Sequence, residues 1–301
     1  MARERLNTTV TQPDEAELAA VARVAERLLA GRPLYDPGLR LVQRRAGAGL
    51  EFLDYRSYVA GDDLRSIDWR ATSRSRRIQV RRFHEEAAAD WMICVDRSAS
   101  MATSGGDKWQ LAVQLAAAMA YVLLSSSNRV GLALFSDSVD GICPLGRGHR
   151  HYANALETLV AQPPRDAGGA SNLTVCTRVT RPGTSVIVIS DLLTADGMQA
   201  GLARLKRTAG PLHVFQVNSE RDFALAGDGP LTLVDAESGQ QLAVLADSSL
   251  TAEARAAWAQ HHSALAAYCA RANIHLTAAR TEQSWKTAVL GHLKRLAGRH
   301  A

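Results

Sequence analysis

Short runs of apolar residues alternate with longer amphipathic stretches over the last two thirds of the chain. The short runs predict buried strands, and the stretches with apolar residues at helical spacing predict helices. The expected strands are residues 91–95, 130–135, 185–189, 212–217 and 274–278, with a short edge strand at about 139–144. The expected helices are residues 107–124, 151–160, 197–206 and 252–270, with a C-terminal helix near 285–296. This alternation predicts an α/β fold with a doubly wound, mostly parallel sheet.

The chain ahead of this repeating part has a different pattern. A helical periodicity over about residues 11–29 leads into a connector rich in proline and glycine, and arginines with short strand signals follow. We therefore expect three parts: an N-terminal helix and linker at 1–38, a small arginine-rich β extension at 39–90, and the α/β domain at 91–301.

An insertion at about residues 227–247 carries the signal of a β-hairpin. Two short apolar runs flank a turn that contains Asp235 and Glu237. These acids either form an exposed tip that meets a partner or serve as ordinary solvated turn residues.

Oxygen-bearing side chains follow two of the expected buried strands. Asp96, Ser98 and Ser100 form a D-x-S-x-S segment after the first, and Asp191 follows the strand at 185–189. Ser171 adds a hydroxyl from a loop between them. Two carboxylates and three hydroxyls suit a hard cation such as Mg²⁺, Mn²⁺ or Ca²⁺. Asp and Ser after a strand are also common turn and cap residues, so the pentapeptide alone is weak evidence.

The order of this segment, the later hydroxyl and the later aspartate resembles the metal-ion-dependent adhesion site of von Willebrand factor A-type domains. The resemblance implies a Rossmann-type fold in which the hydroxyls bind Mg²⁺ directly and the two aspartates mostly hold waters. It also implies that the open metal position captures a carboxylate from a partner. Ser171 departs from the usual threonine but keeps the hydroxyl.

A second resemblance lies ahead of the α/β domain and is more specific. The residues that carry it are Arg56, Tyr58, Gly61, Asp62, Asp63, Arg65, Ile67, Asp68, Trp69, Arg74, Glu85 and Glu86. They are similar to the signature of domain-of-unknown-function family 58, and the likeness extends from about residue 40 onward. The resemblance implies a partnership with a MoxR-type AAA+ ATPase or its client, in the assembly or maturation of protein complexes.

The arginines of this segment allow three interpretations. They can pair with nearby carboxylates as a structural network, since guanidinium forks bind carboxylates bidentately. They can instead form a surface for an acidic protein partner or for nucleic acid. The candidate partner-binding arginines are Arg74, Arg76, Arg77, Arg81 and Arg82. Nucleic acid is disfavoured, because a net charge of +5 is modest for a chain of 301 residues and no nucleic-acid-binding motif is present.

Composition narrows the class of protein further. The chain is 47% hydrophobic but only 5% aromatic, which predicts a core of aliphatic residues. The sequence has no secretory signal, and its longest apolar stretch is too short to span a membrane, so we expect a cytoplasmic protein. The cysteines are scattered and lack metal-binding or redox spacing.

Enzymatic motifs are missing from the sequence. It contains no nucleotide-binding P-loop and no G-x-S-x-G nucleophile elbow. A metal-dependent hydrolase of phosphoesters stays as the enzymatic alternative, since a bound cation can activate water. The sequence favours a non-enzymatic protein–protein interaction module that depends on a metal ion.

Overall fold

The computed structural model describes residues 11–29, 46–47, 51–59, 62–75, 77–84, 89–165, 170–193, 197–223 and 229–298. The chain divides into two compact units, one formed by Pro37–Ala88 and the other by Met1–Asp36 together with Ala89–Ala301.

The larger unit is built on a six-stranded sheet with the order β11-β8-β7-β4-β5-β6. Its strands are β4 (Asp90–Asp96), β5 (Arg129–Phe135), β6 (Val139–Gly146), β7 (Ser185–Ser190), β8 (Leu212–Asn218) and β11 (His275–Arg280). All neighbours pair in parallel except β6, which runs antiparallel to β5 at the edge. The strand order reverses at β4, because β5 lies on one side of it and β7 on the other. Such a reversal opens a crevice at the carboxyl ends of the strands, where ligands bind in doubly wound sheets.

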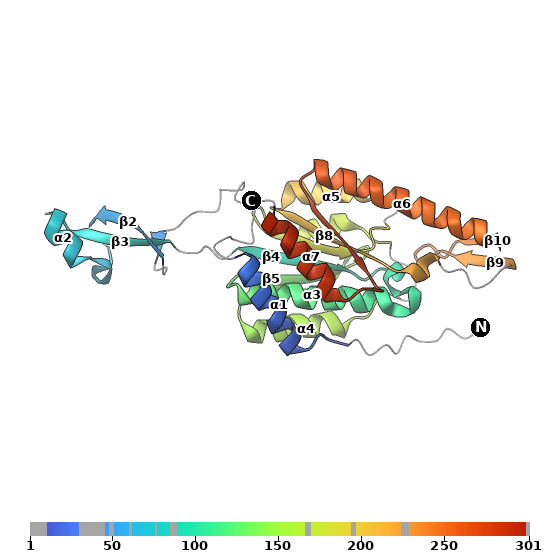
Figure 1. Ribbon diagram of the computed structural model, residues 1–301, viewed down its shortest axis with the longest axis horizontal. Helices are drawn as coiled ribbons and strands as arrows, with labels where there is room; N and C mark the ends of the chain where they lie inside the picture. Colours follow the sequence, from blue (N-terminus) through green and yellow to red (C-terminus); the bar gives the residue numbers. More distant parts are fainter. Residues whose placement is uncertain are drawn as a thin grey trace. The chain divides into compact units, whose positions relative to one another are not determined.

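Helices cover both faces of this sheet (Figure 1). They are α1 (Glu15–Leu28), α3 (Asp107–Ser125), α4 (His149–Ala161), α5 (Met198–Thr208), α6 (Ser248–Arg271) and α7 (Trp285–Gly298). Side chains of β4 alternate between the two cores, as a strand requires. Trp91, Ile93 and Val95 pack with α1, α3, α4 and α7. Met92 and Cys94 pack with α5 and α6. The predicted mixed α/β fold with a mostly parallel sheet is confirmed.

The expected hairpin lies between β8 and α6. It consists of β9 (Gly229–Val234) and β10 (Gln241–Ala246), which pair antiparallel with Leu233 opposite Leu242. The 3₁₀ turns that the structure describes in this unit are η2 (Ala99–Ala102), η3 (Ser104–Gly106), η4 (Leu173–Arg178) and η5 (Glu220–Phe223). None of the helices that the structure describes is long and apolar enough to span a membrane.

The smaller unit holds a three-stranded antiparallel sheet with the order β1-β3-β2. Its elements are β1 (Ala46–Gly47), β2 (Glu51–Ser57), η1 (Leu64–Ser66), α2 (Trp69–Ser75) and β3 (Gln79–His84). Arg56 binds Asp62 bidentately, at 2.7 and 2.6 Å. Asp68 accepts a hydrogen bond from the Tyr55 hydroxyl at 2.9 Å and lies 3.3 Å from Arg81 Nε. Arg56 and Asp62 of the family signature therefore pair with each other inside this unit, and Asp68 of the signature binds neighbouring residues there.

Candidate metal centre

Asp96 is the centre of a buried network of hydroxyl groups. It is the last residue of β4 and is fully buried. Its Oδ1 accepts a hydrogen bond from the Ser98 amide at 2.8 Å. Its Oδ2 accepts hydrogen bonds from Ser171 Oγ and Ser190 Oγ, both at 2.6 Å. These bonds tie the loop that carries Ser171 and the end of β7 to the end of β4.

The carboxyl group of Asp96 is held in an environment that opposes ionisation. Burial raises its pKa to about 6, and the nearby charge of Asp191 acts in the same direction. The hydrogen bonds from Ser171, Ser190 and Ser98 partly oppose this shift, because they stabilise the ionised form. A cation beside Asp96 would oppose it as well.

Ser98 and Ser100 complete the predicted set of hydroxyls. Their Oγ atoms lie 3.0 Å apart, and both residues are buried. The 3₁₀ turn η2 begins directly after Ser98, and it brings the side chains of the two serines together. Four of the five predicted metal-binding residues are thus joined by hydrogen bonds, either to Asp96 or between the two serines.

Asp191, the fifth predicted residue, follows β7 and pairs with a lysine. Its Oδ1 accepts a hydrogen bond from the Leu193 amide at 3.2 Å. Its Oδ2 lies 3.1 Å from Nζ of Lys108, which also lies 3.2 Å from Oδ2 of Asp222. Lys108 is only 1% exposed. A buried ammonium therefore bridges two carboxylates beside the predicted metal residues, and sequence reasoning had missed it.

Of the two acids of the hairpin turn, Glu237 is the one that lies by this network. Its carboxyl group lies close enough to the Ser171 backbone for that backbone to act on its pKa. Burial raises the pKa of Glu237 to about 7, and the charges of Asp191 and Asp96 contribute to the rise. Asp235 instead accepts hydrogen bonds from backbone amides of its own turn. The hairpin thus brings a third carboxyl group toward the residues at the ends of β4 and β7.

His261 of α6 is a further neighbour that sequence reasoning passed over. Burial lowers its pKa, and the charge of Asp191 opposes that shift. Its Nε2 is buried and has no hydrogen-bond partner within the described parts of the chain. The sequence signal was weak, because His261 and His262 are adjacent on a helix and share no motif with the strand ends.

A family model described as "Protein of unknown function DUF58" matches residues 54–264. The chain belongs to this family. The uncharacterized proteins Rv1480 of Mycobacterium tuberculosis and Mb1516 of Mycobacterium bovis are each 28% identical to it over 281 residues, which is 90% of this chain and 87% of theirs. Among solved structures, the pilus adhesin SpaC from Lactobacillus rhamnosus GG in its open conformation matches 71% of this chain at 10% identity. The match covers only 30% of the adhesin's length, and its TM-score is 0.39.

The predicted partner-binding arginines of this DUF58 protein belong to its smaller unit. Arg74, Arg77 and Arg81 are exposed. Arg76 lies outside the described residues, and only the backbone of Arg82 is described. Arg81 pairs with Asp68 across the unit's own fold, so at least this arginine has a structural partner.

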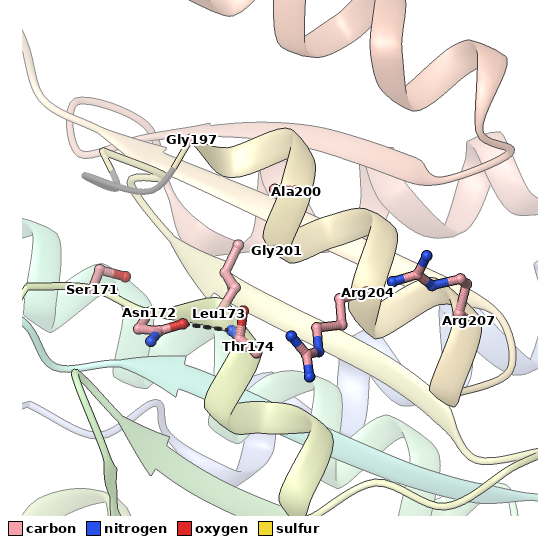
Figure 2. A pocket seen from close by; sticks show the side chains of 9 residues that line it. All are labelled: Ser171, Asn172, Leu173, Thr174, Gly197, Ala200, Gly201, Arg204 and Arg207. Atoms are coloured by element: carbon pink, nitrogen blue, oxygen red, sulfur yellow. Dashed lines mark hydrogen bonds between the residues drawn. The ribbon is translucent and has the colours of Figure 1, made fainter.

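A pocket of about 220 Å³ adjoins the network on the side of α5. Figure 2 shows Ser171 at one end of this pocket and Arg207 at the other. Arg204 lies between these two residues and belongs, like Arg207, to α5. Asn172 caps η4 here, since its Oδ1 accepts a hydrogen bond from the Thr174 amide at 2.9 Å. The Ser171 loop therefore borders a pocket that is also lined by the positively charged side chains of Arg204 and Arg207.

The donor set fits a hard divalent cation. Mg²⁺ prefers oxygen ligands and keeps several waters, and the network offers carboxylate and hydroxyl oxygens at one edge of the sheet. No group of three or more Asp, Glu, His or Cys side chains suited to a metal occurs in the described ranges. A centre at this edge would therefore depend on the hydroxyls of Ser98, Ser100 and Ser171, as the resemblance to an adhesion site implies.

Proposed function

We propose that this DUF58 protein is a non-enzymatic protein–protein interaction module that recognises its partner through a bound metal ion. Its larger unit would be a von Willebrand factor A-like domain with a metal-ion-dependent adhesion site. The residues that would hold Mg²⁺, or Mn²⁺ or Ca²⁺ in its place, are Asp96, Ser98, Ser100, Ser171 and Asp191. One observation carries the proposal: hydroxyls from three separate segments converge with Asp96 where the strand order reverses.

The chemistry of the donors supports a binding role. When bound, the cation supplies an electrophilic centre that attracts a carboxylate of the partner. Neutral hydroxyls donate little charge, so they leave such a centre attractive to an acid from outside. Asp96 fixes the hydroxyl of Ser171 at 2.6 Å and thereby positions it at the end of β4. Burial of Asp96 keeps water from competing for these hydrogen bonds.

The partner that we propose is a MoxR-type AAA+ ATPase or one of its clients, as the family resemblance implies. The chain would act as an adaptor in the cytoplasm during the assembly or maturation of protein complexes. A pull-down of the ATPase with and without EDTA tests this step. Capture that is equally strong in both conditions would remove the metal from the interaction.

The metal itself is tested by calorimetric titration of wild type and Asp191→Ala with MgCl₂ and MnCl₂. We expect binding by wild type and a loss of at least tenfold in the variant, the range seen when groups that support a metal are removed. Asp90→Ala is the matched control, because Asp90 begins β4 at the opposite end of the same strand and pairs with the half-exposed Arg129. Absence of binding by wild type at millimolar metal would overturn the proposal.

A further inference from the structure

The hairpin presents Glu237 in a fixed turn. The Asp235 amide donates to the Gln240 carbonyl and the Gly239 amide donates to the Asp235 carbonyl, both at 2.9 Å. Oδ1 of Asp235 accepts hydrogen bonds from the amides of Glu237 and Ser238, at 2.7 and 3.1 Å. Gly239 has a positive φ of 71°, which a residue with a side chain rarely adopts. The hydrogen bonds of the turn therefore engage the carboxylate of Asp235, and the carboxylate of Glu237 takes no part in these bonds.

The carboxyl group of Glu237 is partly buried near the network at the ends of β4 and β7. The Ser171 backbone and the carboxylates of Asp96 and Asp191 are all close enough to act on it electrostatically. Its Oε1 is buried and has no hydrogen-bond partner among the residues that the structure describes. No described lysine, arginine or histidine forms an ion pair with Glu237.

A carboxylate oxygen in this position is unfavourable unless a positive charge compensates it. Burial without a partner costs free energy, and nearby like charges add to the cost. A divalent cation among Asp96, Ser98, Ser100 and Ser171 would meet that need. Building on the proposed function, we propose that Glu237 is an internal carboxylate ligand of this metal centre, and that it occupies the position which the partner's carboxylate would take.

The hairpin is built so that it can withdraw this ligand. β9 and β10 form a separate two-stranded sheet, and the described residues show no strand pairing between it and the central six-stranded sheet. An isolated two-stranded ribbon is only marginally stable by itself. Val234, Leu242 and Leu245 are 58%, 62% and 70% exposed, so little packing holds the hairpin in place. Displacing it would free the metal position without disturbing β4 or β7.

A ligand that is tethered in this way lowers the apparent affinity of any competing acid. The apparent dissociation constant rises by the reciprocal of the fraction of molecules in which the position is open. If Glu237 fills the position in about nine molecules of ten, its removal tightens the binding of an outside carboxylate about tenfold.

The test compares wild type, Glu237→Gln and Asp235→Asn with Mn²⁺ and a fluorescein-labelled hexaglutamate peptide. Asp235→Asn is the matched control, because it removes the same charge from the same turn and keeps an oxygen that can accept the turn's hydrogen bonds. Mn²⁺ uptake is measured first by calorimetry. Peptide binding is then measured by fluorescence polarisation, once with Mn²⁺ and once with EDTA, so that contacts with Arg204 and Arg207 are subtracted.

We expect the Mn²⁺-dependent affinity for the peptide to rise about tenfold in Glu237→Gln and to stay within twofold of wild type in Asp235→Asn. Equal peptide affinities in Mn²⁺-loaded wild type and Glu237→Gln would overturn the role of Glu237 and leave the metal-dependent module standing. Failure of all three proteins to take up Mn²⁺ would overturn both proposals.

Discussion

The ammonium group of Lys108 offers a sharp test of the electrostatics at the ends of β4 and β7. Lys108 is almost fully buried in the first turn of α3, and its Nζ lies between Asp191 and Asp222 at 3.1 and 3.2 Å. Lys108→Met keeps an unbranched side chain of similar length and removes the charge. Asp191, which is 1% exposed, then loses its cationic partner.

The expected cost follows from this burial. Removing one partner of a buried ion pair destabilises a protein by about 3–5 kcal/mol, because the other charge is left uncompensated. The side chain of Asp222 is 20% exposed, so water offsets part of the loss on that side and the lower end of the range applies. A loss of about 3 kcal/mol lowers the melting temperature of a protein of this size by roughly 6–12 °C.

Magnesium should restore part of this loss. A cation bound beside Asp191 supplies the missing positive charge, and binding only to the folded state adds about 2.7 kcal/mol at a hundredfold excess over Kd. Thermal melts of wild type and Lys108→Met with MgCl₂ or EDTA measure both effects. Lys286→Met is the matched control, because the pair of Lys286 with Glu17 is well exposed, and such pairs contribute at most about 1 kcal/mol. A melting temperature of Lys108→Met within 2 °C of wild type would refute the reasoning.

Two further predictions concern the packing around the site and its pH dependence. Gly201→Ala should destabilise the protein by about 1–3 kcal/mol, because a new Cβ would lie 2.8 Å from Leu173 Cβ. Gly291→Ala should instead stabilise its helix by about 0.5–1 kcal/mol, since no atom would lie nearer than 3.7 Å to its new Cβ. Urea unfolding measures both changes, and an equal shift in the two variants would contradict this prediction. Burial lowers the pKa of His292 to about 3 and holds the pKa of His213 well below its usual value. Both histidines therefore stay neutral in the folded protein, whereas in the unfolded chain they bind protons as the pH falls below about 6.5. The free energy of unfolding should therefore drop between pH 6.5 and 5 by up to about 1.4 kcal/mol per pH unit for each histidine, and an equally steep drop in His292→Gln would count against this explanation.

The fold could be predicted from the sequence because its cores depend on periodicity. Every residue of β4 from Trp91 to Asp96 is buried, as the continuous apolar run indicated. The helix expected at 252–270 begins earlier, at Ser248, because Asp247 caps it by accepting a hydrogen bond from the Leu250 amide at 2.9 Å. Such end effects depend on one side chain, so a hydrophobic pattern does not reveal them.

The ends of β4 and β7 could be placed together from the same pattern. In a doubly wound sheet, both strands point their carboxyl ends at one edge, so Asp96 and Asp191 had to lie near that edge. Ser190 was visible next to Asp191, but its hydrogen bond to Asp96 depends on β4 and β7 being direct neighbours. Strand order across the sheet is a tertiary property, and alternation along the chain does not determine it.

Lys108 and Glu237 could not be placed because their partners come from distant segments. A lysine in the first turn of a helix ordinarily extends into solvent, and nothing local to Lys108 indicates that Asp191 and Asp222 enclose it. For Glu237 part of the answer was local. An aspartate at the start of a turn tends to bind its own backbone, as Asp235 does, so the other acid was the better candidate for a contact elsewhere.

The charges around the site divide it into two halves, which differ in whether a described cationic side chain compensates the acids. Lys108 compensates Asp191 and Asp222, but it forms no hydrogen bond or ion pair with Asp96 or Glu237 among the described contacts. On that second side, burial raises the pKa of Asp96 to about 6 and that of Glu237 to about 7. Both carboxyl groups are therefore harder to ionise than usual, and a nearby positive charge would favour their ionised forms. A divalent cation held by the hydroxyls would supply it, and the ammonium of Lys108 is already engaged on the other side.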